Sequence, residues 1–201
     1  DARTIYEVPL LLHEEGLDEI IVKHLNIWAR KPDLTSWQSV MNRFTNPLKS
    51  VEIAIVGKYV ELTESYKSIN EALIHAGIFH QVKIDFNYID SEDLTSDTLE
   101  KTLAGSQAIL VPGGFGERGV QGKIMAIKYA RENNIPFFGI CLGLQMAVVE
   151  YAKNVAGISN ASSQEFSPDS KFNVIHKIET QIHVTKKGGT MRLGDYDCRI
   201  Q

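Results

Sequence analysis

Hydrophobic and polar positions change their spacing in a regular way from residue 51 onward. Short apolar runs, which predict buried strands, occur at 51–56, 82–89, 108–111 and 136–140. Stretches with helical spacing follow them at about 66–77, 94–103, 119–133 and 142–155. This strict alternation of strands and helices predicts an α/β fold, in which a mostly parallel open sheet carries helices on both faces.

The ends of these strands indicate where a functional site should form. Right-handed crossovers bring the loops at the carboxyl ends of adjacent parallel strands to one crevice. We therefore expect functional residues after positions 56, 111 and 140. The extended segments within residues 170–201 alternate apolar and polar side chains, which predicts antiparallel strands that form either an edge of the main sheet or an appended sheet.

Residues 1–50 follow a different pattern from the rest of the chain. Two short amphipathic segments separated by Gly16 occupy residues 1–30, and their apolar face predicts packing against a further surface. Residues 31–50 contain prolines around a short predicted helix, which is typical of an ordered linker. The pattern thus predicts the end of one domain, a linker, and a second domain over residues 51–201.

Composition and charge narrow the classes of protein. The 201 residues are 43% hydrophobic, enough for a sizeable buried core. A net charge of -4 with both signs interspersed gives no basic field, so neither nucleic acid nor a membrane is an expected partner. No apolar run approaches the roughly 18 residues of a membrane span. Two cysteines, Cys141 and Cys198, fit a reducing cytoplasm, and the Cys and His spacing offers no metal site.

One cysteine stands at a turn between a predicted strand and a predicted helix. Cys141 follows the apolar run 136–140 and has Gly139 and Gly143 two residues away on either side. The glycines allow a tight turn that exposes the sulfur, as in a nucleophile elbow. The N-terminus of the following helix favours a thiolate, and the N–H of Leu142 would face an oxyanion. A buried cysteine packed as a small hydrophobe is the plain alternative, and the paired glycines favour the nucleophile.

A glycine-rich loop follows the strand predicted at 108–111. Residues 112–119 include four glycines, whose backbone N–H groups can approach a ligand without obstruction by side chains. A flexible turn is the plain interpretation, and a cradle for an oxyanion or a phosphate is the alternative. Because one crossover helix separates this loop from Cys141, we expect the N–H of Gly114 to act with that of Leu142 as the second oxyanion donor.

Two further loops carry charged side chains. Residues 57–68 superficially resemble a phosphate-binding loop but lack its second glycine and its Gly-Lys-Ser/Thr ending, so we exclude a nucleoside triphosphatase site there. Lys58 and Lys67 are either solvated charges or face a partner domain. Glu165 lies in the polar loop 160–166 and by default faces solvent, unless a substrate carries an ammonium group.

The segments Gly139–Gln145 and Pro112–Gly116 together resemble the triad-type, class I glutamine amidotransferases. Within that group the resemblance narrows to the bacterial CTP synthase family and runs through nearly the whole chain. The narrowing rests on residues 56–62, 66–68, 111–119, 160–166 and 188–194. It implies that residues 1–30 are the end of an ATP-dependent synthase domain, residues 31–50 the linker, and residues 51–201 a glutaminase domain that is incomplete at its C-terminus.

The resemblance also implies a role for each matching residue. Cys141 would be the nucleophile that attacks the side-chain amide of glutamine, giving a glutamyl thioester and ammonia. The N–H groups of Gly114 and Leu142 would hold the oxyanion, and Glu165 would bind the amino group of the substrate. The residues that would contact glutamine are Gly114, Leu142, Gly143, Leu144, Gln145 and Glu165.

Cofactors and partners are likewise implied by the resemblance. Ammonia would pass to the synthase domain of the same protein, where UTP becomes CTP with the use of ATP and Mg²⁺. GTP would activate the enzyme, and Arg118 is the candidate contact for it. No cofactor is expected in this chain itself, and the full-length protein would be a cytoplasmic homotetramer.

One part of the family pattern is missing from the sequence. The family completes its triad with a His-Pro-Glu segment near the C-terminus, and none of the six histidines is followed by Pro-Glu. His183 is a poor substitute, because it precedes the matching segment 188–194 instead of following it. We therefore expect the parent protein to be active and this chain alone to be inactive for want of a base.

Two alternatives stay open at this point. The chain could be a noncatalytic module that serves assembly or regulation, which the missing histidine favours. It could also be the glutaminase of a different amidotransferase, which the resemblance of residues 1–30 to the end of a CTP synthase domain disfavours. The first alternative predicts that a glutamine-like electrophile leaves Cys141 unmodified.

Overall fold

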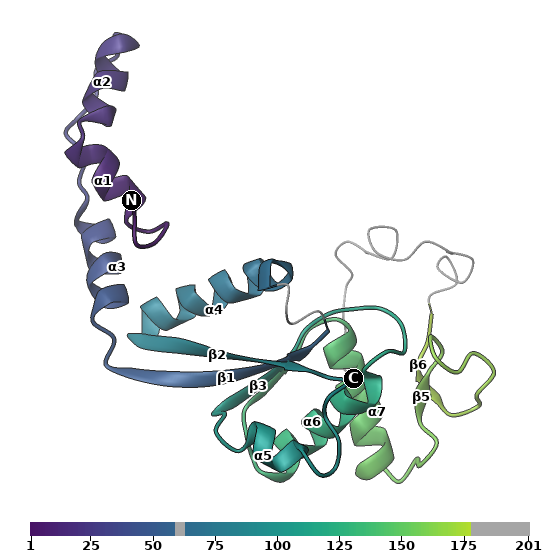
Figure 1. Cartoon of the computed structure of the whole chain (residues 1–201). Helices are drawn as coiled ribbons and strands as arrows, with labels where there is room; N and C mark the ends of the chain where they lie inside the picture. The colour runs from purple at the N-terminus through teal and green to yellow at the C-terminus, as the bar shows by residue number, and fades with distance from the viewer. Residues whose placement is uncertain (59–62, 178–201) are drawn as a thin grey trace. The chain divides into compact units, whose positions relative to one another are not determined.

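The structure, a computed structural model, describes residues 1–58 and 63–177 (Figure 1). The chain divides into two compact units. Unit 1 consists of residues 1–51 and 66–85, and unit 2 of residues 52–65 and 86–201. None of the described helices combines the length and the apolar character that crossing a membrane requires.

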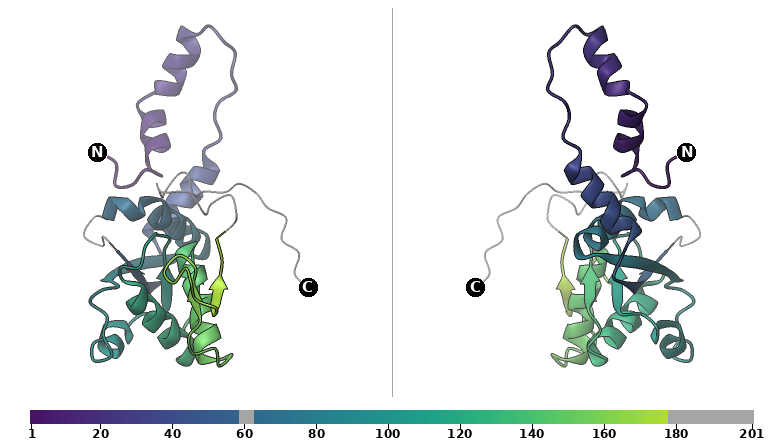
Figure 2. Two further views of the ribbon diagram at one scale, coloured as in Figure 1. Left: turned by 90° about the vertical axis from the view of Figure 1, so that its right-hand side faces the viewer. Right: turned by 90° about the vertical axis from the view of Figure 1, so that its left-hand side faces the viewer.

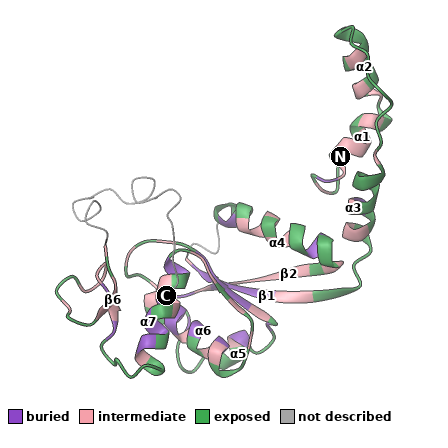
Figure 3. Cartoon of the chain, turned by 180° about the vertical axis from the view of Figure 1, so that it is seen from behind, coloured by how far each residue is buried: buried purple, intermediate pink, exposed green. Residues whose placement is uncertain are grey.

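Unit 1 contains helices α1 (Val8–Glu14), α2 (Leu17–His24), α3 (Thr35–Thr45) and α4 (Lys67–His80). Gly16, with a φ of 74°, separates α1 from α2, so the predicted break at this glycine is confirmed. Tyr6, Met41 and Ile78 form a small buried core between these helices. Figure 3 shows that parts of α1 and α2 are exposed. In and beside these helices, the exposed large apolar residues include Ile5, Ile20, Ile21, Leu25, Ile27 and Trp28.

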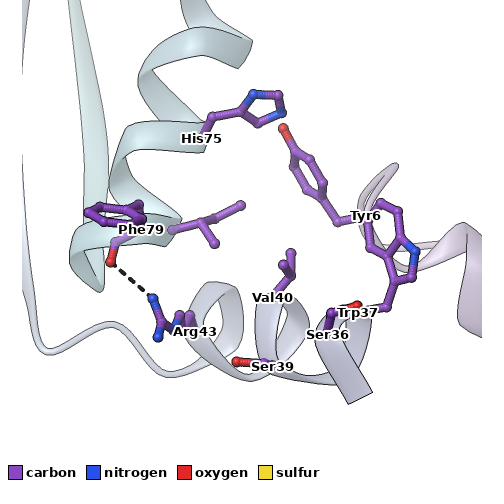
Figure 4. A pocket seen from close by; sticks show the side chains of 9 residues that line it. Tyr6, Ser36, Trp37, Ser39, Val40, Arg43, His75 and Phe79 are labelled. Carbon is purple, nitrogen blue, oxygen red and sulfur yellow. Dashed lines mark hydrogen bonds between the residues drawn. The ribbon is translucent and has the colours of Figure 1, made fainter. Parts of the chain in front are cut away.

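A pocket of about 470 Å³ lies against this small core within unit 1 (Figure 4). The hydroxyl of Tyr6 donates a hydrogen bond of 2.8 Å to the carboxylate of Glu71, and burial and this carboxylate raise the pKa of Tyr6. Arg43 donates to the backbone oxygen of Phe79 at 3.2 Å. The other side chains around the pocket are Ser36, Trp37, Ser39, Val40, His75 and Ile78.

The main sheet has the strand order β2-β1-β3-β4. Its strands are β1 (Lys49–Gly57), β2 (Val82–Asp90), β3 (Ala108–Val111) and β4 (Phe137–Gly139). Strand β3 pairs in parallel with both neighbours, with Ile55 opposite Leu110 and Val111 opposite Gly139. The N–H of Leu48 donates to Gln81 before β1 and β2, and the N–H of Ser91 donates to Gly57 at their ends. These bonds match a parallel pair, and the predicted α/β fold with a mostly parallel sheet is confirmed.

Two of the helices that follow β2 pack on β3 and β4, and a third packs on one of these two helices. They are α5 (Leu99–Leu103), α6 (Val120–Glu132) and α7 (Leu142–Asn154), and a short 3-10 helix, η1, covers Thr63–Tyr66. Helices α6 and α7 pack on each other and both contact β3 and β4, as Figures 1 and 2 show. The core between them includes Val56, Ile109, Val111, Ile127, Leu142 and Met146, each at most 5% exposed. This core fixes the carboxyl ends of β3 and β4, where the two predicted functional loops begin.

The prediction of an antiparallel edge is wrong for the part of it that the structure describes. Strand β6 (Asn173–Ile175) pairs in parallel with β5 (Ser162–Ser163) in a separate two-stranded sheet. Side-chain bonds shape the intervening loop: the amide of Asn173 donates to the Ser167 oxygen, and Ser162 bonds to the Ser167 hydroxyl. These local bonds turn the chain so that the second segment runs with the first. The remaining predicted strands lie beyond residue 177, outside the described residues.

Candidate active site

Cys141 lies between β4 and α7 with an uncommon backbone conformation. Its φ is 52° and its ψ is -109°, although it carries a side chain. Such a conformation is strained for any residue except glycine and gathers at functional sites. The residue is exposed and caps the N-terminus of α7. The predicted strand-to-helix turn is confirmed, and the alternative of a buried cysteine packed as a hydrophobe is wrong.

The two glycines beside Cys141 are required by close backbone contacts. A Cβ on Gly143 would lie 2.0 Å from the backbone oxygen of Val111, and a Cβ on Gly139 would lie 2.6 Å from the carbonyl carbon of Gly143. No side chain fits at either position without a backbone shift. The glycines therefore allow the elbow to press against the end of β3.

The glycine loop after β3 meets the elbow directly. A Cβ on Gly113 would lie 3.3 Å from the Cβ of Cys141 and 3.9 Å from its Sγ. The N–H of Ile140 also donates to the oxygen of Val111 at 3.0 Å, which ties the start of the elbow to the end of β3. The loop and the cysteine thus share one site, as the strand order requires. Gly113, which the motifs did not single out, is the glycine that touches Cys141.

The candidate oxyanion donors come from these same two segments. Leu142 is 1% exposed and begins α7, where the first N–H groups of a helix lack acceptors within it. A Cβ on Gly114 would lie 3.7 Å from Cδ2 of Leu142, so the loop packs on the first turn of the helix. This brings two segments with backbone donors next to a thiol, an arrangement that suits stabilisation of a tetrahedral intermediate.

The other candidate residues for glutamine line the start of α7. Gly143 is buried, Leu144 is 59% exposed, and Gln145 is half-buried with its N–H bonded to the oxygen of Cys141 at 3.1 Å. Residues 142–145 thus form the first turn beside the thiol. Their contact with a substrate stays a prediction.

Glu165 and Lys58 both bind the glycine loop. Oε1 of Glu165 accepts a hydrogen bond of 2.9 Å from the N–H of Gly116, and the Nζ of Lys58 donates to the oxygen of Phe115 at 3.1 Å. Glu165 is half-buried, so the default interpretation of a solvent-facing carboxylate is wrong. Burial and the nearby charge of Arg118 lower the pKa of Lys58, while Glu92, Glu165 and Asp90 oppose this. Lys58 thus contacts its own unit and is more than a solvated charge.

Lys123 is a buried cation next to the glycine loop. It lies on α6 with 1% of the residue exposed, and its Nζ is 3.8 Å from the position of a Cβ on Gly114. Burial and the charge of Lys58 lower the pKa of Lys123 to about 8, and Asp90 acts in the opposite direction. Interior positions with strongly lowered pKa values are candidates for function.

The sequence motifs did not reveal Lys123, but helical spacing could have done so. The buried face of α6 includes residues three, four and seven positions further along, at Ala126, Ile127 and Ala130. A lysine on that apolar stripe is the signal, because a solvated lysine belongs on the opposite face. Spacing alone does not show which loop the ammonium reaches.

Arg118, the candidate contact for GTP, lies next to the last residue of the glycine loop. Its guanidinium forms a salt bridge with Glu92, and Arg118 also lowers the pKa of that carboxyl group. More than half of the Arg118 side chain is exposed. The residue is accessible to a ligand, and its role with GTP stays a prediction.

In unit 2 the described histidine is His176, whose Nε2 lies 2.8 Å from the oxygen of Asn173. One of its ring nitrogens is therefore engaged locally, and we assign no described residue to the role of a base. His183 and the segment 188–194 lie outside the described residues. The described part of the chain holds no group of three or more metal-ligating side chains.

A match to a family model shows to which protein family the chain belongs. The family model described as "Glutamine amidotransferase class-I" matches residues 61–201, more than half of the chain. The chain belongs to this family. The amidotransferase match covers the glycine loop, the elbow at Cys141 and Glu165, the three features that lie together in the structure.

Two relatives of this chain are named CTP synthase, a narrower group than the amidotransferase family. CTP synthase of Geobacter metallireducens is 59% identical over 201 residues, and CTP synthase of Carboxydothermus hydrogenoformans is 52% identical over 200 residues. Each alignment covers 100% of this chain and 37% of the relative. The chain therefore spans little more than a third of the length of these curated relatives.

A solved structure agrees with this similarity. The glutaminase domain of Trypanosoma brucei CTPS with bound acivicin has a TM-score of 0.61 and 44% sequence identity to this amidotransferase. The match covers 65% of this chain and 51% of that structure. The similarity thus extends from the sequence to the fold of the domain.

Proposed function

We propose that the chain is the glutamine-hydrolysing part of a CTP synthase, and that Cys141 is its nucleophile. The observation that carries the proposal is the strained, exposed Cys141 at the start of α7, packed against Gly113. The family match and the identity with CTP synthases support it. A noncatalytic module would have no need to keep a cysteine in a strained conformation beside an open loop.

The proposed chemistry begins with attack of the Cys141 sulfur on the side-chain amide carbon of glutamine. The thiol loses its proton as a carbon–sulfur bond forms, and the carbonyl electron pair moves to oxygen, where the N–H groups of Leu142 and Gly114 would stabilise it. The released proton is the one that the departing nitrogen takes up. The carbon–nitrogen bond then breaks as the nitrogen receives a proton, and ammonia leaves. Water attacks the thioester, which releases glutamate and restores the thiol.

Glu165 has the chemistry to hold the substrate. A carboxylate has about four lone-pair sites, so it can accept the N–H of Gly116 and also an ammonium group. We assign the α-ammonium of glutamine to Glu165, with residues 142–145 lining the rest of the site. This assignment keeps the reacting amide near Cys141 and the charged end of the substrate near the loop of Glu165.

The replacement Cys141→Ala tests the proposal in the full-length protein. We expect glutamine-dependent CTP formation to fall by at least about 10³-fold, because the carbon–sulfur bond cannot form, while added ammonia still supports the reaction. A steady-state assay with either nitrogen source gives both rates. Equal loss of both activities would contradict the role of Cys141, and unchanged glutamine-dependent activity would contradict the proposed function.

The remaining assignments concern the full-length protein. We propose that ammonia passes to a synthase domain that uses ATP and Mg²⁺ to convert UTP to CTP, and that the protein is a cytoplasmic homotetramer.

GTP is the proposed activator, with Arg118 as its contact. In GTP titrations of the glutamine-dependent rate, Arg118→Met should raise the half-activating concentration about tenfold. An unchanged concentration would remove Arg118 from this role.

A further inference from the structure

Two charged side chains hold a single peptide group in the glycine loop. Lys58 donates to the oxygen of Phe115, and Glu165 accepts the N–H of Gly116. These two backbone atoms belong to the same peptide bond. Because a peptide bond is planar and trans, its C=O and N–H point in opposite directions. One cation and one anion therefore bind the two ends of one dipole, and rotation of this peptide would break both bonds.

The two side chains come from segments far apart in the sequence. Lys58 directly follows β1, and Glu165 follows β5, so 57 and 49 residues separate them from their partners in the loop. Gly116 has a φ of 80°, and a Cβ there would meet nothing within 4 Å. Its conformation, and not crowding, favours glycine at this position. The loop is thus open to solvent on that side, and the two charged contacts hold the peptide.

We propose that Lys58 and Glu165 form a peptide clamp that orients the glycine loop for substrate, and that Lys58 is a positioning residue for glutamine binding. The inference rests on the proposed function. With Lys58 holding the oxygen of Phe115, the N–H of Gly116 faces Glu165 and keeps that carboxylate in place for the substrate ammonium. Gly114, two residues earlier, is held in the same loop. Lys58 itself touches neither the thiol nor the amide in this scheme.

The test compares two electrophiles that react with Cys141 in the full-length protein. The glutamine analogue 6-diazo-5-oxo-L-norleucine carries an α-ammonium group, and iodoacetamide does not. Labelling of Cys141 is followed by intact mass over a range of analogue concentrations. We expect Lys58→Met to raise the half-saturating analogue concentration about tenfold, the size of one lost charged hydrogen bond. The rate with iodoacetamide should stay within about twofold, because the thiol itself is unchanged.

Two variants separate positioning from a general loss of structure. Lys58→Arg keeps a cationic donor and should restore most of the analogue binding. Lys128→Met removes an exposed lysine of α6 whose partner, Glu132, is 3.7 Å away, and should change nothing. Thermal unfolding of each variant checks that the fold is kept. If Lys58→Met slows both electrophiles alike, or leaves the analogue unaffected, the peptide clamp is wrong.

A double variant tests whether Lys58 and Glu165 act through the same peptide. If they do, the combined effect of Lys58→Met and Glu165→Gln on analogue binding should be clearly smaller than the product of the single effects. Independent effects that multiply would contradict the shared peptide. Absence of saturable labelling in the unmodified protein would instead contradict the proposed function, and with it the peptide clamp.

Discussion

Helices α6 and α7 pack on each other, yet their two ends are built in opposite ways. At the N-terminal ends lie the strained backbone of Cys141 and the buried Lys123. At the C-terminal ends, Glu150 is 1% exposed and its carboxylate accepts bonds from Arg131 and from the amide of Asn154. Within the described part of the chain, Lys123 forms no salt bridge, whereas Glu150 is well satisfied.

The difference indicates that the C-terminal ends of α6 and α7 hold the two helices together, whereas the N-terminal ends form the proposed site. A buried carboxylate held by a guanidinium and an amide fixes how the two helices meet, and nothing in that arrangement is open to a ligand. The buried amine of Lys123 and the strained backbone of Cys141 both destabilise the fold. The N-terminal ends therefore carry the proposed chemistry, and the C-terminal ends hold the helices that support it.

The largest loss of thermal stability should come from removing the salt bridge between Arg131 and Glu150 at the C-terminal ends. Arg131→Met leaves the carboxylate of Glu150 buried without its cation, a strongly destabilising change. We expect the thermal unfolding midpoint to fall by roughly 5–10 °C. The double variant Arg131→Met with Glu150→Leu should recover much of this loss, since an apolar pair of similar volume has no buried charge. If the double variant is no better than the single one, the cost does not come from the unpaired carboxylate.

A smaller change in stability, of opposite sign, should follow from replacing Lys123 near the N-terminal end of α6. Lys123→Met keeps most of the side-chain volume and removes the buried amine, so at pH 7 we expect the free energy of unfolding to rise by about 1–2 kcal/mol. The pKa of Lys123 is lowered in the folded state from 10.5 to about 8. Between pH 10.5 and pH 8 the folded protein therefore binds fewer protons than the unfolded chain, so the free energy of unfolding decreases as the pH falls through this range.

Urea unfolding at pH 7.5 and pH 9.5 measures this second prediction. The advantage of Lys123→Met over the unmodified protein should shrink at the higher pH, where the lysine is largely neutral in the folded state. Lys128→Met on the exposed face of the same helix is the control and should show no such pH dependence. An advantage that stays constant between the two pH values would show that volume, and not charge, is responsible.

The strands and the elbow could be predicted because their signals are local. The apolar run 108–111 became β3 without change, and the glycines beside Cys141 marked a strand-to-helix turn. The helix predicted at 94–103 is shorter, because α5 covers only Leu99–Leu103. The hydroxyl of Thr98 bonds to the N–H of Thr95 and to the oxygen of Asp93, which holds these residues in a turn before the helix.

The partners of the charged residues could not be predicted in the same way. Nothing near Lys58 in the sequence indicates that its ammonium reaches the oxygen of Phe115, which lies on the loop of another strand. The contact of Glu165 with Gly116 likewise joins two residues that are far apart in the sequence. Such pairs depend on how β1, β3 and β5 are brought together, so spacing predicts the loops that meet and not the bonds between them.

Glycine could adopt the backbone of Cys141 at no steric cost, since it lacks the Cβ that makes a φ of 52° unfavourable. A lineage that no longer used the sulfur would therefore gain stability from the simplest replacement at this position. Relatives that keep the fold but carry glycine at residue 141 would therefore be expected to have lost the reaction that depends on the thiol.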